Sequence, residues 1–435
     1  MKKLLILALA TVALSVSAFA QQGDPAAGLK ELNDLRTKMF NENRVGLTQA
    51  KVNEINDAIK AKALELVKGV DVDKVEAAQA YSWAQLFSQA GKHQETCDLV
   101  KKYLSTNPEP PMKYSAQSLM MSACNALGEA DMLQQTLLSV RVPAAAQSMG
   151  LAQTTVYSYV DTIVEKLGVD AGIKTLDEVE KNLILEAPAD YAKRMFESDK
   201  KRAEAAGNTT ETDEARTKRL EAAGANMQLS TKFLFVDKRA ELYEHNGEKS
   251  KALALLQAFI QEAPEGAPVL RSAKASLSRM AMLGAPAPAL VSERAYGTYE
   301  GLAALKGKVV LLDFFAHWCG PCINSFPDMK KLYADNKDKG LEVVGFTTYY
   351  KYYKQEKDLA PDAEFAKMGE FIKEYELPWP VVYGERSNFD AYGVTGIPHV
   401  TVIDRAGNIR KIKIGYSKES FKEFKEYIEK LLAEK

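Results

Sequence analysis

Apolar residues recur at spacings of three and four from about Pro25 to Leu283, where Ala and charged residues are frequent and runs of Val and Ile are rare. Such spacings place apolar side chains on one face of a helix. The pattern therefore predicts an all-α N-terminal domain, which we assign to residues 21–284.

Two segments of this region share a more specific pattern. Gly91 lies at a predicted helix–helix turn and precedes by 17 positions Pro108, where the second helix ends; the same spacing separates Gly247 from Pro264. Both segments resemble the helical hairpins of tetratricopeptide repeats, and Gly128 marks the turn of another. An irregular helical bundle without a regular superhelix stays open as the alternative.

The pattern changes after Pro286 and Pro288. "KVVLLDFF" is a continuous apolar run, typical of a strand covered on both faces. Segments of helical and strand pattern then alternate, and "HVTVID" and "IRKIKIG" flank the turn "RAGN" as a hairpin before a final amphipathic helix. This β-α-β-α-β-β-α order predicts a three-layer α/β domain over residues 285–435.

The first 20 residues have the pattern of a secretory signal. Two lysines precede an apolar core from Leu4 to Leu14, and Ala18-Phe19-Ala20 offers small residues at a cleavage site. The core is shorter than the ~20 apolar residues that a membrane-spanning helix needs. We therefore expect cleavage after Ala20 and export to an oxidising compartment, most simply a bacterial periplasm.

Composition narrows the function only slightly. Lys plus Arg is 57 and Asp plus Glu is 58, so no basic excess indicates nucleic acid as a partner. Four cysteines are too few for a disulfide-stapled scaffold, so each pair needs its own explanation. Cys97 and Cys124 fall on predicted neighbouring helices. A disulfide between them stays open, because bridging requires Cα atoms within roughly 7 Å.

The stretch "FFAHWCGPC" places the other two cysteines where a buried strand ends and a helix begins. Cys319 is predicted at the helix N-terminus, where the backbone dipoles lower a thiol pKa from about 8.5 toward 7 or below. Cys319 is then the nucleophile, and Cys322, one turn inside the helix, resolves the mixed disulfide. Pro321 suits the first helical turn, since its missing N–H would have no partner there.

Three other roles fit this pair less well. A zinc site needs two more ligands, and the domain offers only His317 and His399 besides the pair. A purely structural disulfide across two intervening residues closes almost no loop. A peroxidase of the peroxiredoxin pattern needs a Thr where Ala316 stands. We predict thiol-disulfide exchange without a metal or another cofactor.

The segment "LKGKVVLLDFFAHWCGPCINSFPDMKKLYADNKDKGLEVVGFT", followed by "YGVTGIPHVTVIDRAGNIR", resembles the thioredoxin fold and, within it, the exported thiol-disulfide oxidoreductases of the TlpA/ResA type. The resemblance covers about residues 284–435. It implies that Ile397–Pro398 is a cis peptide bond facing the dithiol. The Ile397 backbone would then hydrogen-bond an extended substrate, while Trp318 and Pro398 form an apolar rim.

The direction of exchange is a separate prediction. Gly320-Pro321 between the cysteines is typical of strongly reducing members of the fold, which favours a reductase of protein disulfides. An exported reductase needs electrons from a membrane donor. Isomerase and oxidant roles stay open, as does a helical scaffold or peptide-binding protein that carries an accessory redox domain and binds a protein partner on its helices.

Asp313 is the predicted acid–base residue. It lies six residues before Cys319 in the apolar run and matches the buried acid of thioredoxins, while Ser325 stands where many members of the exported group carry a Glu. Desolvation there would raise the carboxyl pKa and poise Asp313 to accept the Cys322 proton.

Four tyrosines after the strand "LEVVGFT" allow two interpretations, a partner-contact surface or ordinary packing against the sheet. They are Tyr349, Tyr350, Tyr352 and Tyr353.

Overall fold

The computed structural model describes residues 23–44, 47–207 and 210–434. The chain divides into two compact units, Met1–Leu242 and Tyr243–Lys435. The predicted signal sequence lies outside the described residues. Among the helices that are described, none is both long and apolar enough to cross a membrane.

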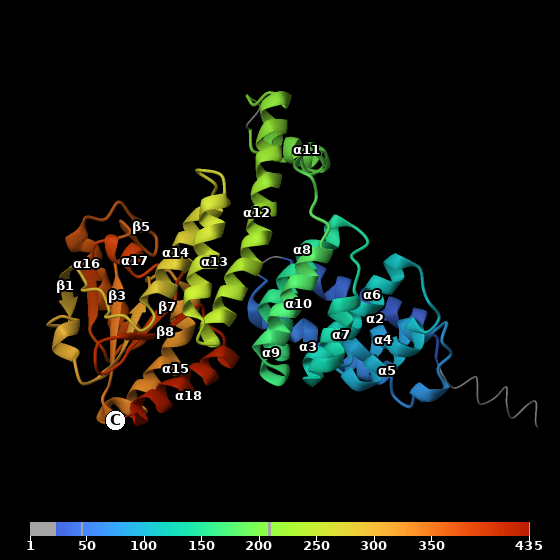
Figure 1. Ribbon diagram of the computed structural model, residues 1–435, viewed down its shortest axis with the longest axis horizontal. Coiled ribbons are helices and arrows are strands. Elements are labelled where there is room, and N and C mark those ends of the chain that lie inside the picture. Colours follow the sequence, from blue (N-terminus) through green and yellow to red (C-terminus); the bar gives the residue numbers. More distant parts are fainter. Residues whose placement is uncertain (1–22, 45–46, 208–209, 435) are drawn as a thin grey trace, which may run out of the picture. The chain divides into compact units, whose positions relative to one another are not determined.

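The first unit is built from helices joined mostly by short turns (Figure 1). Their bounds are α2 Pro25–Glu42, α3 Gln49–Leu66, α4 Ala80–Gln89, α5 His93–Leu104, α6 Pro110–Leu127, α7 Ala130–Ser139, α8 Ala145–Thr154, α9 Val160–Leu167, α10 Val169–Asn182, α11 Pro188–Ala205 and α12 Asp213–His245, with short helical turns η1 Val72–Lys74 and η2 Thr155–Tyr159.

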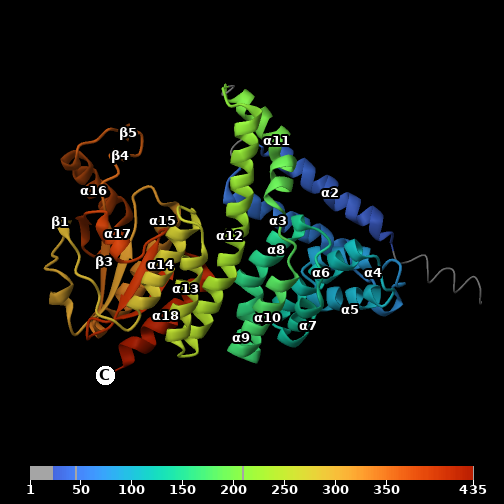
Figure 2. The ribbon, with the colours of Figure 1, turned by 45° about the horizontal axis from the view of Figure 1, so that its top comes forward.

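Consecutive helices of this unit pack as antiparallel pairs. α4 packs on α5, α5 on α6 and α6 on α7 (Figure 2). The turns of two pairs need a left-handed residue, which Gly supplies at no steric cost: φ is 72° at Gly91 and 71° at Gly128. The predicted helical hairpins are therefore present, and a regular superhelical repeat remains a prediction.

Over its described residues, the second unit combines six α-helices with a six-stranded sheet and a small two-stranded sheet, β4-β5 (Figure 1). Its strands run in the order β1-β6-β3-β2-β7-β8. The bounds are α13 Lys249–Glu262, α14 Val269–Met282, β1 Ser292–Tyr296, η3 Leu302–Leu305, β2 Val309–Phe314, α15 Gly320–Asn336, η4 Lys337–Lys339, β3 Leu341–Thr347, β4 Tyr352–Tyr353, β5 Glu356–Lys357, α16 Pro361–Tyr375, β6 Val381–Gly384, α17 Ser387–Ala391, β7 His399–Ile403, β8 Ile409–Ile414 and α18 Lys418–Ala433.

The apolar run became the central strand that its pattern predicts. β2 runs parallel to β3 and antiparallel to β7, and all six of its residues are buried. β7 and β8 form the predicted hairpin. The sheet also has two strands that the sequence did not indicate, because β6 has only four residues and β1, "SERAY", is a polar edge strand.

Alternate residues of β2 enter two different cores. Leu311 shares its core with Phe326 of α15, Phe371 of α16 and Phe424 of α18. Leu312, on the other face, shares a core with Phe389 of α17 and with half-buried residues of the 282–305 segment. Each fully buried Leu or Phe contributes about 1.5–3 kcal/mol, so the strand that leads into the dithiol is held firmly from both sides.

The second unit begins before the predicted domain start at residue 285, because α13 and α14 belong to it. Arg279 of α14 donates to the carbonyl oxygen of Gly393 at 2.8 Å, and the Gly284 amide donates to the Ile409 oxygen at 2.7 Å. The division at Leu242 and Tyr243 falls within α12, which ends at His245, so the hairpin around Gly247 remains a prediction. The boundary near 285 remains a prediction for where the α/β portion begins.

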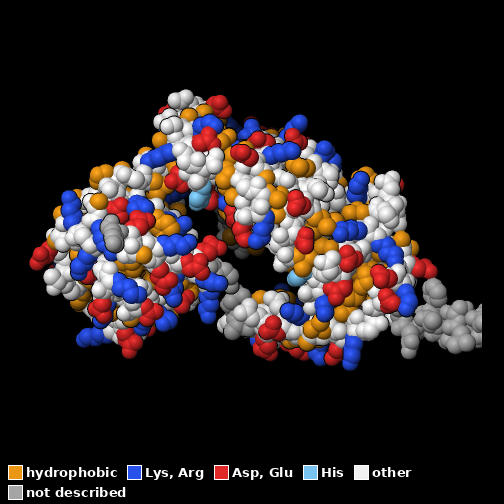
Figure 3. Space-filling model, turned by 60° about the horizontal axis from the view of Figure 1, so that its bottom comes forward, with side chains coloured by type: hydrophobic (Ala, Val, Ile, Leu, Met, Phe, Trp, Pro, Cys, Tyr) orange, Lys and Arg blue, Asp and Glu red, His pale blue; other side chains and the backbone are white. Residues whose placement is uncertain are grey.

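Surface charge is mixed in sign. Figure 3 shows Lys and Arg side chains interspersed with Asp and Glu over the visible face, without a patch of a single sign.

Candidate functional site

The two cysteines lie at the end of β2, where the chain turns into α15. Cys319 is the N-cap of α15 and is joined to Cys322 by a disulfide with Cα atoms 5.3 Å apart. The Cys322 amide donates to Cys319 Sγ at 3.2 Å. Cys322 is fully buried, whereas Cys319 lies beside Trp318, whose side chain is 48% exposed. The pair is thus asymmetric, with Cys319 next to the surface.

A second loop faces Cys319 from the opposite side of the site. The Ile397–Pro398 peptide bond is cis, as the resemblance implied. The carbonyl oxygen of Ile397 lies 3.7 Å from Cys319 Sγ, although the residues are 78 positions apart. The Pro398 oxygen accepts a hydrogen bond from the Gly415 amide at 2.8 Å, which fixes this loop to the end of β8.

The predicted rim differs in one respect from the structure. Trp318, Gly320 and Pro321 are exposed and Ile397 is half-buried, but Pro398 is buried. The accessible surface beside the disulfide is therefore made by Trp318, the Gly320-Pro321 turn and Ile397.

Asp313 is buried in β2, the strand that leads into the disulfide. It is 1% exposed and lies on the face of β2 that carries Leu311, in the core to which Cys322 contributes. Neither carboxylate oxygen has a hydrogen-bond partner among the described residues. Burial raises the pKa of Asp313 to about 7. Ser325, nearby on α15, instead donates to the Cys322 carbonyl oxygen at 2.7 Å.

The two histidines beside the motifs are buried. Burial lowers the pKa of His317 to about 4 and that of His399 to about 3. Both imidazoles are consequently neutral at neutral pH and add no positive charge near the thiols. Within the described residues, no group of three or more His, Cys, Asp or Glu side chains is arranged to hold a metal ion.

A tyrosine-rich segment, residues 349–353, packs against the active-site loop. The Tyr350 ring meets the Trp318 ring edge-on at 5.4 Å, and the His317 ring lies 5.2 Å from that of Tyr352. Tyr353 is buried at 3% exposure. Packing therefore accounts for Tyr353 in the core and for the contact of Tyr350 with Trp318, and a partner-contact surface remains a prediction.

Glu364 of α16 fixes this segment and was not singled out by the sequence. It is 1% exposed. Its carboxylate accepts hydrogen bonds from the Tyr350 amide at 2.8 Å and the Lys351 amide at 2.7 Å. An acidic residue in the first turn of a helix is ordinary, so only the fold distinguishes Glu364 from its exposed neighbours.

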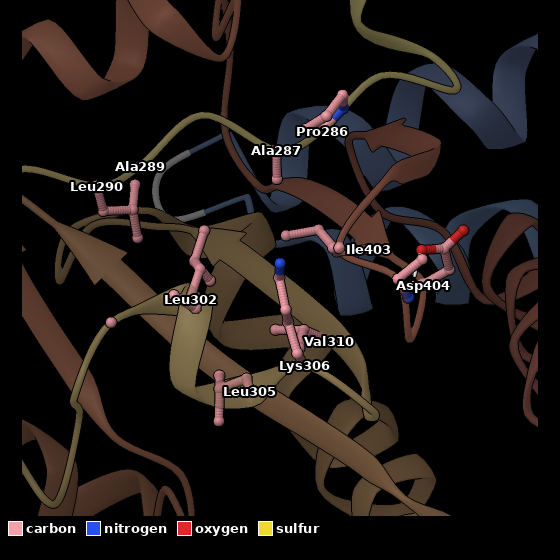
Figure 4. Close-up of a pocket in the computed structure, with 14 residues that line it drawn as sticks. Pro286, Ala287, Ala289, Leu290, Leu302, Leu305, Lys306, Val310, Ile403 and Asp404 are labelled. Atoms are coloured by element: carbon pink, nitrogen blue, oxygen red, sulfur yellow. Dashed lines mark hydrogen bonds between the residues drawn. The ribbon is translucent and has the colours of Figure 1, made fainter.

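A pocket of about 380 Å³ lies at the other end of the sheet (Figure 4). It is lined mainly by apolar residues, and Lys306 extends into it between Leu302 and Ile403. Ile403 pairs with Val310 at the start of β2, whereas Cys319 follows the end of that strand. The pocket is therefore separate from the dithiol.

Several known proteins are similar in sequence to this unit. The family model described as Redoxin matches residues 282–431. The thiol-disulfide oxidoreductase ResA of Bacillus thuringiensis subsp. konkukian is 32% identical over 144 residues, which cover 33% of this chain and 76% of the relative. The chain belongs to the ResA-type thiol-disulfide oxidoreductases. ResA of Bacillus subtilis is 33% identical over 138 residues, covering 32% of this chain and 70% of the relative.

A solved structure is also similar to part of this chain. The thioredoxin domain of a thiol-disulfide oxidoreductase from Bacteroides vulgatus is 26% identical, covers 34% of this chain and 97% of its own, and has a TM-score of 0.28. For this ResA-type protein, the Redoxin match and the observed sheet give a thioredoxin-like α/β domain after an all-α region, and the activity is thiol-disulfide exchange.

Proposed function

We propose that the protein is an exported reductase of protein disulfides, with Cys319 as nucleophile, Cys322 as resolving thiol and Asp313 as proton acceptor. The observation that carries the proposal is the asymmetric pair at the N-terminus of α15, with the Ile397 carbonyl 3.7 Å from Cys319 Sγ. A backbone oxygen at that place offers an acceptor to an extended substrate that brings its disulfide to Cys319.

The reaction starts from the reduced protein. The Cys319 thiolate attacks one sulfur of a substrate disulfide, forms a mixed disulfide and releases the other substrate sulfur as a thiolate, which takes up a proton. The Cys322 amide, 3.2 Å from Cys319 Sγ, stabilises the anionic sulfur.

Cys322 completes the exchange. Asp313 accepts the Cys322 proton, directly or through a water, and the new thiolate attacks Cys319 Sγ in the mixed disulfide. The second substrate sulfur leaves as a thiol, and the disulfide seen here remains. Two electrons have passed from the protein to the substrate, so a donor must restore the dithiol.

Export and the electron donor belong to the same proposal. The predicted signal sequence supports export of the mature chain to the periplasm. Because that compartment is kept oxidising, we propose a membrane protein with its own dithiol as the donor. Mass spectrometry of the protein purified from the periplasm is expected to find Gln21 as the first residue. A cytoplasmic chain that retains Met1 would contradict export.

Reduction of insulin by the full chain tests the direction. With a dithiol as electron source, the wild type is expected to reduce insulin, whereas Cys319→Ser is expected to be inactive. A reduction potential measured against glutathione is expected near the about −270 mV of thioredoxin, because Gly-Pro separates the cysteines. A potential near the about −120 mV of strong oxidants, with efficient oxidation of reduced substrates, would favour the oxidant role instead.

The helical unit is proposed to bind protein substrates or partners and so to determine which of them reach the redox site. Its helical hairpins offer surface for a protein partner, and the redox site lies wholly in the other unit. Chemical cross-linking of trapped substrate complexes is expected to join the substrate to lysines of the first unit. Cross-links confined to the second unit would leave the helical unit without this role.

A further inference from the structure

The first unit contains a second pair of cysteines, remote in sequence from the redox pair. Cys97 lies on α5 and Cys124 on α6, and their sulfur atoms are 3.6 Å apart. Both are free thiols in this structure. Their exposed fractions are 2% and 0%, so the two sulfurs meet inside the helical core.

The surroundings of this pair differ from those of Cys319. Cys97 shares its helix face with Val100, which is fully buried, and Cys124 follows the buried Ala123. Cys319 is also buried, at 4% exposure, but it lies at the N-cap of α15 between the exposed residues Trp318 and Gly320. A folded substrate or reductant that reaches Cys319 therefore has no comparable approach to the helical pair.

The two thiols also influence each other. Their hydrogen bond lowers the pKa of Cys97 and raises that of Cys124. In the folded chain, Cys97 is accordingly the thiol that ionises first.

We infer that Cys97 and Cys124 form a structural disulfide that joins α5 to α6. Two sulfur atoms at 3.6 Å need to approach by only about 1.5 Å to reach the ~2.05 Å of an S–S bond. The helices are already adjacent, so closure needs no rearrangement of the fold.

The bond forms by ordinary exchange with an external disulfide such as oxidised glutathione. The thiolate of one of the two cysteines attacks a glutathione sulfur and releases one glutathione thiol. The thiolate of the other cysteine then attacks the protein sulfur of this mixed disulfide and releases the second glutathione thiol. Two protein thiols lose two electrons and two protons, and one glutathione disulfide becomes two thiols. Because both cysteines are buried in the packed unit, the exchange takes place before the helices close over them.

The position of the proposed disulfide indicates how it stabilises the helical unit. α5 ends one helical pair and α6 begins the next, and the cysteines are 27 positions apart. A covalent link here constrains the unfolded chain across the connection between the two pairs. It stabilises the helical unit without taking part in catalysis, and the inference does not depend on the reductase proposal.

Peptide mapping of the full-length wild type tests the bond directly. The chain is unfolded and reduced, refolded with oxidised and reduced glutathione, alkylated and digested with trypsin without reduction. Trypsin places Cys97 in residues 93–101 and Cys124 in residues 114–141, while Cys319 and Cys322 share residues 309–330. The expected product is a cross-linked pair of the first two peptides. Recovery of both as alkylated, unlinked peptides would overturn the inference.

Graded reduction of the folded chain separates a structural bond from an exchangeable one. Dithiothreitol is expected to open Cys319–Cys322 at concentrations that leave Cys97–Cys124 intact until denaturant is added. Opening of both bonds together in the folded chain would refute the structural role. Insulin reduction by the Cys97→Ala variant is expected to equal that of the wild type, since the redox site is unchanged.

Thermal unfolding measures the contribution of the bond. In a Cys319→Ser/Cys322→Ser background, the oxidised and reduced forms differ only at Cys97 and Cys124. The oxidised form is expected to unfold roughly 5–15 °C higher. Equal melting temperatures for two forms shown by mapping to differ in this bond would contradict a stabilising role. The comparison uses one amino-acid sequence, so a cavity left by substitution cannot account for the shift.

Discussion

The Sγ atom of Cys319 lies 3.7 Å from the carbonyl oxygen of Ile397, a residue that reaches the site from the start of β7. The contact joins two parts of the chain that have different proposed functions in the exchange reaction. One supplies the sulfur that breaks the substrate bond, and the other supplies a backbone acceptor that aligns the substrate with it. A substitution in the Cys319 segment or in the Ile397 segment is thus expected to affect the exchange reaction while the backbone of the other segment keeps its conformation.

The asymmetry of the two cysteines predicts which variant traps substrates. In Cys322→Ser, Cys319 still attacks but nothing resolves the product, so disulfide-linked partners are expected to accumulate. Non-reducing gels of periplasmic extracts, followed by mass spectrometry, measure the adducts. Cys319→Ser is the matched control and is expected to trap few or none, because Cys322 is fully buried. More adducts with Cys319→Ser would reverse the two roles.

Trp318 is predicted to serve protein substrates more than small ones. Trp318 is 48% exposed, and its ring contacts that of Tyr350 edge-on. Trp318→Ala is expected to lower kcat/KM for insulin about 5- to 30-fold, the loss typical of an aromatic anchor, and to change the rate with a small aromatic disulfide little. Val291→Ala, at a side chain 55% exposed in the same unit, is the control and is expected to change neither rate. Equal losses on both substrates would show that Trp318 acts on the thiol itself.

Glu364 is predicted to position the segment of Tyr350 that contacts Trp318. Glu364→Gln removes the negative charge of the carboxylate that accepts hydrogen bonds from the Tyr350 and Lys351 amides. The free energy of unfolding, measured with urea, is therefore expected to fall by about 1–3 kcal/mol. KM for insulin is expected to rise severalfold while the reduction potential stays unchanged, since neither cysteine is touched. Glu370→Gln, at an exposed position of the same helix, controls for the loss of a charge on α16. An altered potential in Glu364→Gln alone would place its effect on the dithiol instead.

The sequence predicted those features that depend on local patterns. The apolar run of β2 is typical of a strand buried on both faces, and the change from this strand pattern to a helical pattern predicted that Cys319 lies at a helix N-terminus. The sequence did not predict the short and polar strands, because these strands are stabilised by pairing with adjacent strands and not by a local pattern. β6, for example, is four residues long and lies between β1 and β3. The burial of Glu364 depends in the same way on a tertiary contact, the approach of residues 350–351 to α16, which no periodicity records.

Asp313 gives the sharpest prediction, since it couples catalysis to stability. Its pKa of about 7 means that the carboxylate becomes available as pH rises through neutrality. Asp313→Asn removes the proton acceptor and is expected to lower the rate of insulin reduction by about 10- to 100-fold at neutral pH. Ser325→Ala, which changes a buried side chain that bonds the Cys322 carbonyl, is the control and is expected to alter the rate little.

The same carboxyl sets the sign of the stability change. The folded-state pKa of Asp313 lies above the ordinary value of 3.8, so its protonated form is favoured by folding, and the wild type loses stability as pH rises from about 4 through about 7. The loss amounts to a few kcal/mol at most. Asp313→Asn carries no charge, so its melting temperature is expected to exceed that of the wild type by a margin that widens between pH 5 and pH 8. A constant margin across that range, together with an unchanged rate from pH 6 to 9, would exclude Asp313 as the base that activates Cys322.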